Sequence, residues 1–328
     1  MAAAHALTSD THTRVAATVP KPASLLPRGA FDSHVHVFDP TIGPYASNRA
    51  YTPEDAPLDR LIAFNKSISK YGTGSSIVLV QPSPYKSDCT VLLKCLQELQ
   101  NQKRAAYGIA VVDVQAIQDT ELERMHKLGV RGIRLNFQAD GKGVDIPGLM
   151  ASLRTAAARI AHLPGWIIQL FVPGFVWDNI FDGVRTLPVP IIADHLGGMR
   201  GASKLGPDLA ENPLQQPGFN SLVRLAQMSK LIIKVSGLYR ASGSTETCYH
   251  DTRPIIETLS REVPDQCIWG SDWPHTGEGK DRVNGDLGVK EPFRSIDDAA
   301  ILENVREWVG GEGAWQKLMT DNPSRLFQ

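Results

Sequence analysis

The chain has no long apolar run, no excess charge and no paired cysteines, and each absence excludes a class of protein. No uninterrupted apolar stretch approaches the roughly 18 residues that span a bilayer. Thirty-four basic residues balance 35 acidic ones, a net charge of −1, which leaves no basic footprint for nucleic acid or an anionic membrane. The four cysteines have no CxxC spacing, so a disulfide scaffold is not expected. These absences predict a soluble protein of a reducing compartment, the cytoplasm.

The first 28 residues differ in composition from the rest of the chain. They are rich in Ala, Thr, Pro and Ser and show no apolar periodicity, which predicts a flexible N-terminal arm over residues 1–28. Because the arm carries more basic than acidic residues, a mitochondrial targeting segment is the alternative reading. Residues 29–328 then form a single domain, a length that one α/β barrel commonly reaches.

Short β-branched runs alternate with helical patterns through that domain, with no Gly/Ser linker between them. The predicted strands are Ala30–His36, Ser76–Gln81, Ala105–Val112, Val130–Phe137, Trp166–Phe171, Val189–His195, Leu231–Ser236 and Gln266–Asp272. The predicted helices are Leu58–Lys70, Ser87–Asn101, Thr120–Leu128, Ile146–His162, Phe175–Arg185, Phe219–Lys230, Thr252–Arg261 and Ser295–Val309. Eight β-then-α units favour a (β/α)₈ TIM barrel. A doubly wound open sheet is the alternative, but no GxGxxG follows the first strand to support it.

The first predicted strand ends in two histidines, His34 and His36, separated by one residue. Side chains alternate faces along a strand, so both imidazoles project to the same side. Such a pair can supply two ligands or two hydrogen-bond donors to one small site. The alternative is an incidental pair on a solvated strand face.

Polar residues also follow the other predicted strands. Arg134 and Asn136 have the inward parity of the strand over residues 130–137, while His195 and Asp272 end the sixth and eighth strands. Active sites of this fold gather at the carboxyl ends of the strands, so these side chains are expected to converge on one rim. For Arg134 the alternative is a buried ion pair with a neighbouring carboxylate.

The motifs HVHVFDP, GVRGIRLNF, ADHLGG, KVSGLYR, WGSDWPH and DNPSRLF together resemble the amidohydrolase superfamily. The similarity runs from about Gly29 to the C-terminus and is greatest to the amidohydrolase-related branch that includes the 2-pyrone-4,6-dicarboxylate lactonases. The resemblance implies a hydrolase that opens a lactone or a related carboxylic ester. The bridging lysine and second metal site of binuclear amidohydrolases are not evident, so at most one metal is implied.

The resemblance also implies roles for particular residues. Asp272 is the general base that activates water. His34, His36 and His195 either stabilise the oxyanion or bind a metal. In a metal-bound form the ligands would be His34, His36 and Asp272, with His195 as a further candidate, and Zn²⁺ would be the expected ion. Arg134 and Arg240 match arginines that hold a substrate carboxylate.

Further contacts and two departures from the family complete the predicted site. The additional substrate-contacting candidates are Gln81, Asn136, Phe171 and Trp273, with Tyr239 beside Trp273 as an apolar wall. Asp140 stands where a second carboxylate-binding arginine is expected, and Phe171 stands where a tyrosine is expected. An acid in place of an arginine repels a dianion, so the resemblance predicts a less anionic lactone.

Two other functions remain open from the sequence. A metal-dependent decarboxylase of an aromatic acid is the alternative within the same superfamily, and a binding protein without catalysis is the alternative on the same fold. The partner is expected to be a small molecule. Specificity in barrels depends on the loops, so neither the substrate nor the oligomeric state follows from the sequence.

Overall fold

The computed structural model describes residues 25–137, 144–278 and 286–328. Within these residues, eight parallel strands form one sheet in the order β1-β3-β4-β5-β6-β7-β8-β9, which follows the chain. The strands are β1 (Phe31–Val35), β3 (Ser76–Val80), β4 (Ala106–Ala110), β5 (Val130–Asn136), β6 (Ile167–Phe171), β7 (Ile191–Ala193), β8 (Leu231–Ser236) and β9 (Cys267–Gly270). Each overlaps one of the eight predicted strands.

The sheet closes where its first and last strands meet. Val35, which ends β1, forms a parallel bridge with Trp273 just after β9. The His36 amide donates to the Trp273 carbonyl at 2.9 Å, and the Asp272 amide donates to the His34 carbonyl at 2.8 Å. Closure confirms the predicted barrel and removes the open sheet from consideration. It also places the two histidines of β1 directly beside Asp272.

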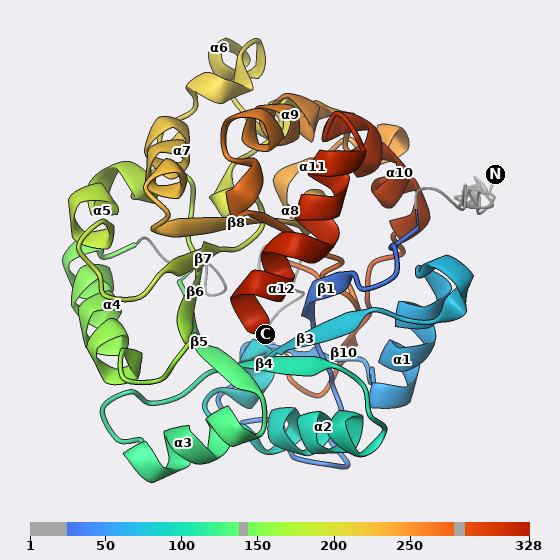
Figure 1. Ribbon diagram of the computed structural model, residues 1–328, viewed down its shortest axis with the longest axis vertical. Helices are drawn as coiled ribbons and strands as arrows, with labels where there is room; N and C mark the ends of the chain where they lie inside the picture. The colour runs from blue at the N-terminus through green and yellow to red at the C-terminus, as the bar shows by residue number, and fades with distance from the viewer. Residues whose placement is uncertain (1–24, 138–143, 279–285) are drawn as a thin grey trace, which may run out of the picture.

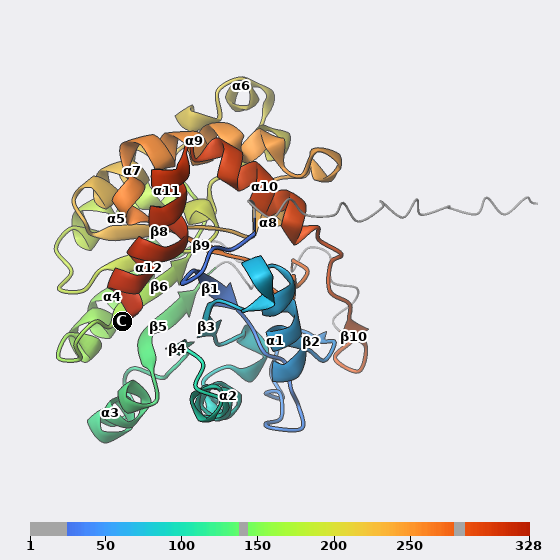
Figure 2. The same ribbon diagram turned by 45° about the vertical axis from the view of Figure 1, so that its right-hand side comes forward.

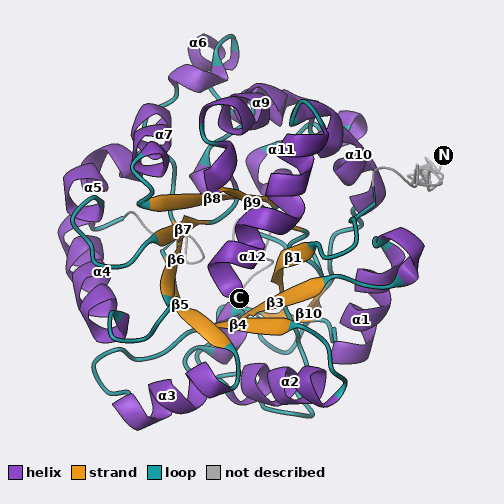
Figure 3. Cartoon of the chain, in the orientation of Figure 1, coloured by secondary structure: helices purple, strands orange, loops and turns teal. Residues whose placement is uncertain are grey.

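Helices form an outer ring around the strands (Figure 3). The eight predicted helices correspond to α1 (Leu58–Ser67), α2 (Thr90–Asn101), α3 (Asp119–Lys127), α4 (Ile146–Ile160), α5 (Val176–Val184), α7 (Phe219–Gln227), α9 (Arg253–Glu262) and α10 (Asp298–Trp308). Their apolar faces pack on the outward side chains of the strands, among them Ile133, Leu135 and Phe137. The short helices α6 (Pro207–Ala210) and α8 (Leu238–Ala241) lie in loops that follow β7 and β8.

The amino-terminal end of the barrel is filled by apolar side chains. A cluster of inward residues that includes Val78, Ile192 and Ile268 packs with Phe327 of the C-terminal helix α12 (Asn322–Phe327). The Phe327 ring stacks on Phe31 at 6.3 Å between centroids, and α12 crosses the centre of the barrel in Figure 1. The sequence did not predict α12 or the preceding α11 (Glu312–Gln316). Because these side chains fill the amino-terminal end, an active site is expected at the opposite end of the barrel.

A two-stranded sheet lies at that opposite end of the barrel. β2 (Thr52–Pro53) pairs in parallel with β10 (Lys290–Glu291), and Figure 2 shows the pair on the side of the barrel away from α12. At the start of the described chain, Leu26 is fully buried, and its amide donates to the Ile68 carbonyl at 3.0 Å. The packed structure therefore includes residues that were expected to belong to the arm. Among the described residues, no helix is long and apolar enough to cross a membrane.

Candidate active site

The two histidines of the first strand lie next to each other at the carboxyl end of β1. Their ring centroids are 5.0 Å apart, and both side chains are buried. His36 Nδ1 lies 2.7 Å from the carbonyl oxygen of Val80, which can only accept a hydrogen bond. The His36 ring therefore carries a proton on Nδ1 and, when neutral, directs the lone pair of Nε2 into the site. Burial lowers the pKa of His36, which favours that neutral form.

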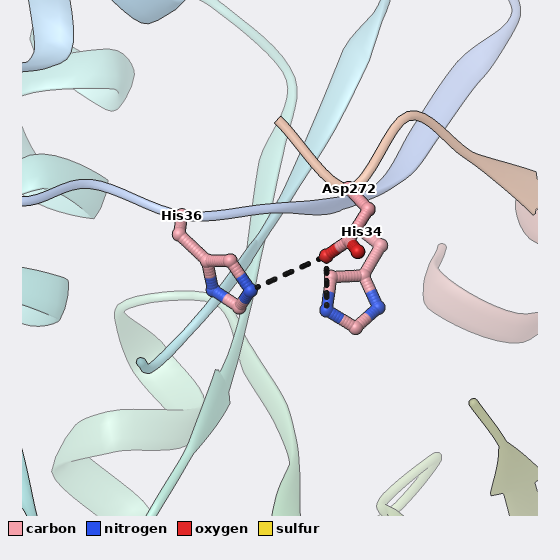
Figure 4. Close-up of side chains that lie close together, drawn as sticks. All are labelled: His34, His36 and Asp272. Atoms are coloured by element: carbon pink, nitrogen blue, oxygen red, sulfur yellow. Dashed lines mark ion pairs between the residues drawn. The ribbon is translucent and has the colours of Figure 1, made fainter. Parts of the chain in front are cut away.

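Asp272 lies opposite the pair, in the loop after β9. Its Oδ1 atom is 3.6 Å from His34 Nε2 and 3.6 Å from His36 Nε2. Figure 4 marks these two pairs with dashed lines. Within the described part of the chain, neither Oδ1 nor His34 Nε2 has a hydrogen-bond partner, although both atoms are buried. Buried polar atoms without partners are rare in proteins, and here they face one another across a small gap.

The other carboxylate oxygen of Asp272 is held firmly. Oδ2 accepts hydrogen bonds from the Tyr239 hydroxyl and from Arg240 Nε, each at 2.7 Å. Burial by itself would raise the pKa of Asp272, but the neighbouring Arg240 guanidinium outweighs it and holds this pKa well below its ordinary value. Asp272 is therefore an ionised carboxylate with one oxygen engaged and one oxygen available.

His195 enters the same space from a turn after β7. Its backbone is left-handed, with φ of 52°, and this conformation directs a residue of outward strand parity back toward the barrel axis. His195 Nδ1 lies 2.9 Å from Ser236 Oγ, and its ring centroid is 4.8 Å from that of His34. Gly237 approaches so closely that a Cβ there would lie 2.6 Å from His195 Nδ1. Burial lowers the pKa of His195 to about 4, so its ring is neutral.

A layer of buried polar side chains lies directly beneath the histidines. Lys234 Nζ donates to Gln169 Oε1 at 2.9 Å and to His34 Nδ1 at 3.3 Å, and it lies 3.3 Å from Asp194 Oδ1. The other oxygen of Asp194 accepts from Gln169 Nε2 at 2.9 Å and lies 3.4 Å from Arg134. Burial alone would raise the pKa of Asp194, but Lys234 holds it well below its ordinary value. The two cations thus neutralise a carboxylate inside the barrel.

The donor set at the mouth suits a divalent ion. One ligand atom from each of His34, His36 and Asp272 lies within 4.8 Å of the others. Two ligands about 2.1 Å from a tetrahedral ion lie about 3.4 Å apart, close to the 3.6 Å separations here. The lone pair of His36 Nε2 facing a carboxylate oxygen also favours a cation between them. A second group, His34, Asp194 and His195, meets the same distance criterion, but Lys234 lies against it.

Three of the predicted substrate-contacting residues contact other residues of the site. Arg134 is buried beside Asp194, the ion pair that the sequence left open as the alternative. Arg240 contacts Asp272, and its NH2 group donates to Thr276 Oγ1 at 2.9 Å. Phe171 lies edge-on against His195 at 4.7 Å between centroids.

Other predicted contacts differ from expectation. The amide nitrogen of Gln81 donates to the backbone carbonyls of Lys86 and Asp88, and its oxygen accepts from the backbone amide of Val111. Gln81 therefore stabilises these loops. Trp273 stacks on Phe64 at 5.7 Å between centroids. Asn136, at the end of β5, is half-buried. Asp140 lies outside the described residues.

Three residues of this site were missed or given another role in the sequence analysis. Tyr239 was expected to form an apolar wall, but its hydroxyl donates to the carboxylate of Asp272. Asp194 and Lys234 were not assigned to the site. The signal for Lys234 was present, because a lysine with inward parity interrupts an otherwise apolar strand, LIIKVS. Such a charge is costly inside a barrel unless it has partners.

The fold and the four residues at its mouth define a barrel enzyme of the amidohydrolase type. A family model described as amidohydrolase matches residues 31–328, and the chain belongs to this family. The resemblance inferred from the sequence motifs is thereby confirmed.

Individual relatives of this chain are lactone hydrolases by name. The chain is 30% identical to a 4-sulfomuconolactone hydrolase of Rhizobium radiobacter, over 92% of this chain and 91% of that protein. It is 31% identical to a 2-pyrone-4,6-dicarboxylate hydrolase of Comamonas testosteroni, over 94% and 92% respectively. A solved structure from Pseudomonas putida, described as a candidate 2-pyrone-4,6-dicarboxylic acid hydrolase, superposes with a TM-score of 0.70 at 29% identity and covers 91% of this chain and 97% of that one.

Proposed function

We propose that this enzyme hydrolyses a lactone by attack of water on the ester carbonyl at the mouth of the barrel. One observation carries the proposal: an ionised carboxylate, Asp272, has one oxygen held by two donors and the other directed at two imidazoles. Kinship with two lactone hydrolases over nine-tenths of the chain supports the choice of substrate class. Neither of these relatives is a decarboxylase, so the alternative gains no support from them.

In the proposed mechanism, Oδ1 of Asp272 accepts a proton from water as the oxygen attacks the carbonyl carbon. Arg240 and Tyr239 keep the carboxylate in place and ionised. An imidazole N–H directed at the carbonyl oxygen, from His195 or His34, stabilises the tetrahedral oxyanion. Asp272 then returns the proton to the leaving alkoxide, which yields the ring-opened hydroxy acid.

A divalent metal ion fits the same residues. His34, His36 and Asp272 would hold it, with His195 as a further candidate, and Zn²⁺ suits a set of two nitrogens and one oxygen. When bound, such an ion lowers the pKa of water and polarises a carbonyl. The orientation of Asp272 by Tyr239 and Arg240 serves the reaction with or without the ion.

The substrate that we propose is less anionic than a pyrone dicarboxylate. Arg134 lies against Asp194 and Arg240 contacts Asp272, so both predicted carboxylate-binding cations already face an internal acid. Asp140 adds a negative charge at a position where the resemblance to the dicarboxylate lactonases predicts an arginine. Phe171 brings no hydroxyl to the face of His195.

A panel of lactones and esters tests this proposal. Ring opening of neutral, monoanionic and dianionic lactones is followed by ultraviolet absorbance, together with elemental analysis of the purified protein for bound metal. We expect the highest kcat/KM for a lactone with one carboxylate or none. Turnover of 2-pyrone-4,6-dicarboxylate as fast as by a dedicated lactonase would contradict the proposed specificity. Release of carbon dioxide from an aromatic acid, without lactone opening, would contradict the reaction class. The location of the enzyme in the cell, which the sequence predicts to be the cytoplasm, remains a prediction.

A further inference from the structure

One ring nitrogen of the site lies between a donor and an acceptor. His34 Nδ1 is 3.3 Å from Lys234 Nζ and 3.4 Å from Asp194 Oδ1, and these two atoms are 3.3 Å apart. All three side chains are fully buried. No other imidazole of the site has this arrangement in the described chain, since Nδ1 of His36 lies on a carbonyl and that of His195 lies on a hydroxyl.

The hydrogen bond at Nδ1 determines what the opposite nitrogen presents to the substrate. When Nδ1 accepts from Lys234, a neutral ring carries its proton on Nε2, and that N–H points toward Asp272. When Nδ1 donates to Asp194, Nε2 carries a lone pair instead. The first form is a donor to an oxyanion, and the second is a metal ligand. The geometry observed here has the hydrogen bond from Lys234, which corresponds to the first form.

Both partners of His34 are kept in place whichever form is present. Gln169 accepts from Lys234 at 2.9 Å through Oε1 and donates to Asp194 Oδ2 at 2.9 Å through Nε2. Arg134 adds a contact to the same Oδ2 at 3.4 Å. The exchange moves one proton. It leaves Nε2 for water at the mouth of the barrel, Nδ1 takes a proton from Lys234 Nζ, and Lys234 regains one from water. The net charge of the ring, Lys234 and Asp194 is the same in both forms, so neither form leaves a buried ion without a partner.

We propose that Lys234 and Asp194 are a positioning pair that lets His34 exchange between a hydrogen-bond donor and a metal ligand. Lys234 supports the Nε2–H form, and Asp194 supports the form with a free lone pair on Nε2. This inference goes beyond the proposed function and does not depend on which lactone is hydrolysed. It explains why one set of residues suits both a metal-free and a metal-bound hydrolase.

Two substitutions separate the partners. Lys234→Met removes the donor, so Nδ1 must donate to Asp194. Asp194→Asn removes the acceptor. Gln169 and Arg134 both donate to the Oδ2 position and hold the new carbonyl oxygen there, so the amide NH₂ faces His34 Nδ1. The two variants are thus expected to lock opposite forms of the ring.

Nitrogen-15 NMR of histidine-labelled protein reads the form directly, with the His34 signals assigned by their loss in His34→Gln. After chelation, we expect an Nε2–H ring in the wild type and in Asp194→Asn, and an Nδ1–H ring in Lys234→Met. Titration with Zn²⁺ should convert the wild type to the Nδ1–H form. Asp194→Asn should bind Zn²⁺ about 10- to 100-fold more weakly, the usual effect of removing a partner of a ligating histidine.

The exposed Lys94→Met on α2 is the matched control and should leave every signal unchanged. The same ring form in chelated wild type and Lys234→Met would overturn the role of Lys234. Wild-type affinity for Zn²⁺ in Asp194→Asn, or no effect of Zn²⁺ on the wild-type ring, would overturn the role of Asp194. If one variant fails to fold, as judged by circular dichroism, the other still decides its half of the proposal.

Discussion

Replacement of Asp272 by asparagine tests the centre of the mechanism with a change of few atoms. Tyr239 and Arg240 both donate to Oδ2, so the carbonyl oxygen of the new amide is held at that position. The NH₂ group then takes the position of Oδ1, which faces His34 and His36 at 3.6 Å. A donor replaces the acceptor at the atom that receives the proton from water in the proposed mechanism.

The size of the effect follows from the role assigned to that atom. Loss of a general base costs typically 10²- to 10⁴-fold in rate, or about 3–5 kcal/mol of transition-state stabilisation. The substitution also leaves Arg240 without its charged partner. Breaking a buried ion pair costs about 3–5 kcal/mol, and less where solvent reaches the arginine, whose side chain is 13% exposed. The variant should therefore fold with a lowered Tm, and activity must be assayed well below that temperature.

The assay is kcat/KM for the best lactone of the panel, across pH 5–9, alongside a thermal unfolding curve. Asp265→Asn, an amide exchange at an exposed site paired with Lys317, serves as the control and should retain activity. If Asp272→Asn folds and keeps kcat/KM within about fivefold of the wild type, Asp272 is not the base. Another group of the site would then have to accept the proton from water.

Three further predictions concern the surroundings of the site. Because Arg240 helps hold the pKa of Asp272 below its ordinary value, Arg240→Met should raise that pKa and move the acidic limb of the rate profile to higher pH; an unmoved limb would contradict this role. Gly237→Ala should lose activity because its Cβ would lie 2.9 Å from Asp272 Oδ2. Gly72 has a similar positive φ and open space around it, so Gly72→Ala is the control. It should lose about 1–2 kcal/mol of stability and keep its activity. Burial raises the pKa of Asp32 from 3.8 to about 7, so between these two pH values the folded state binds one more proton than the unfolded state. The free energy of unfolding should therefore fall as pH rises through that window, by about 4 kcal/mol at most. In urea titrations at several pH values, Asp32→Asn should show a smaller fall.

Local patterns in the sequence determined the barrel and the four residues at its mouth. Period-two alternation, β-branched runs and amphipathic helices at regular spacing reflect how each segment buries its apolar face, and that requirement acts over a few residues. For the same reason the parity of His34 and His36, and of Arg134 in β5, could be derived from the chain alone. Family motifs then supplied the role of Asp272, which periodicity could not.

The tertiary structure decided which polar groups satisfy one another. Lys234 and Asp194 are distant from His34 along the chain, and their meeting depends on strand order and register in the closed barrel. Tyr239 offers a ring and a hydroxyl, and the turn after β8 determined that the hydroxyl reaches Asp272. Burial magnifies each of these contacts, because an unpaired charge inside a protein costs far more than in water. Short-range patterns therefore specified the scaffold and the residues proposed to react, while long-range packing specified the hydrogen bonds that orient them.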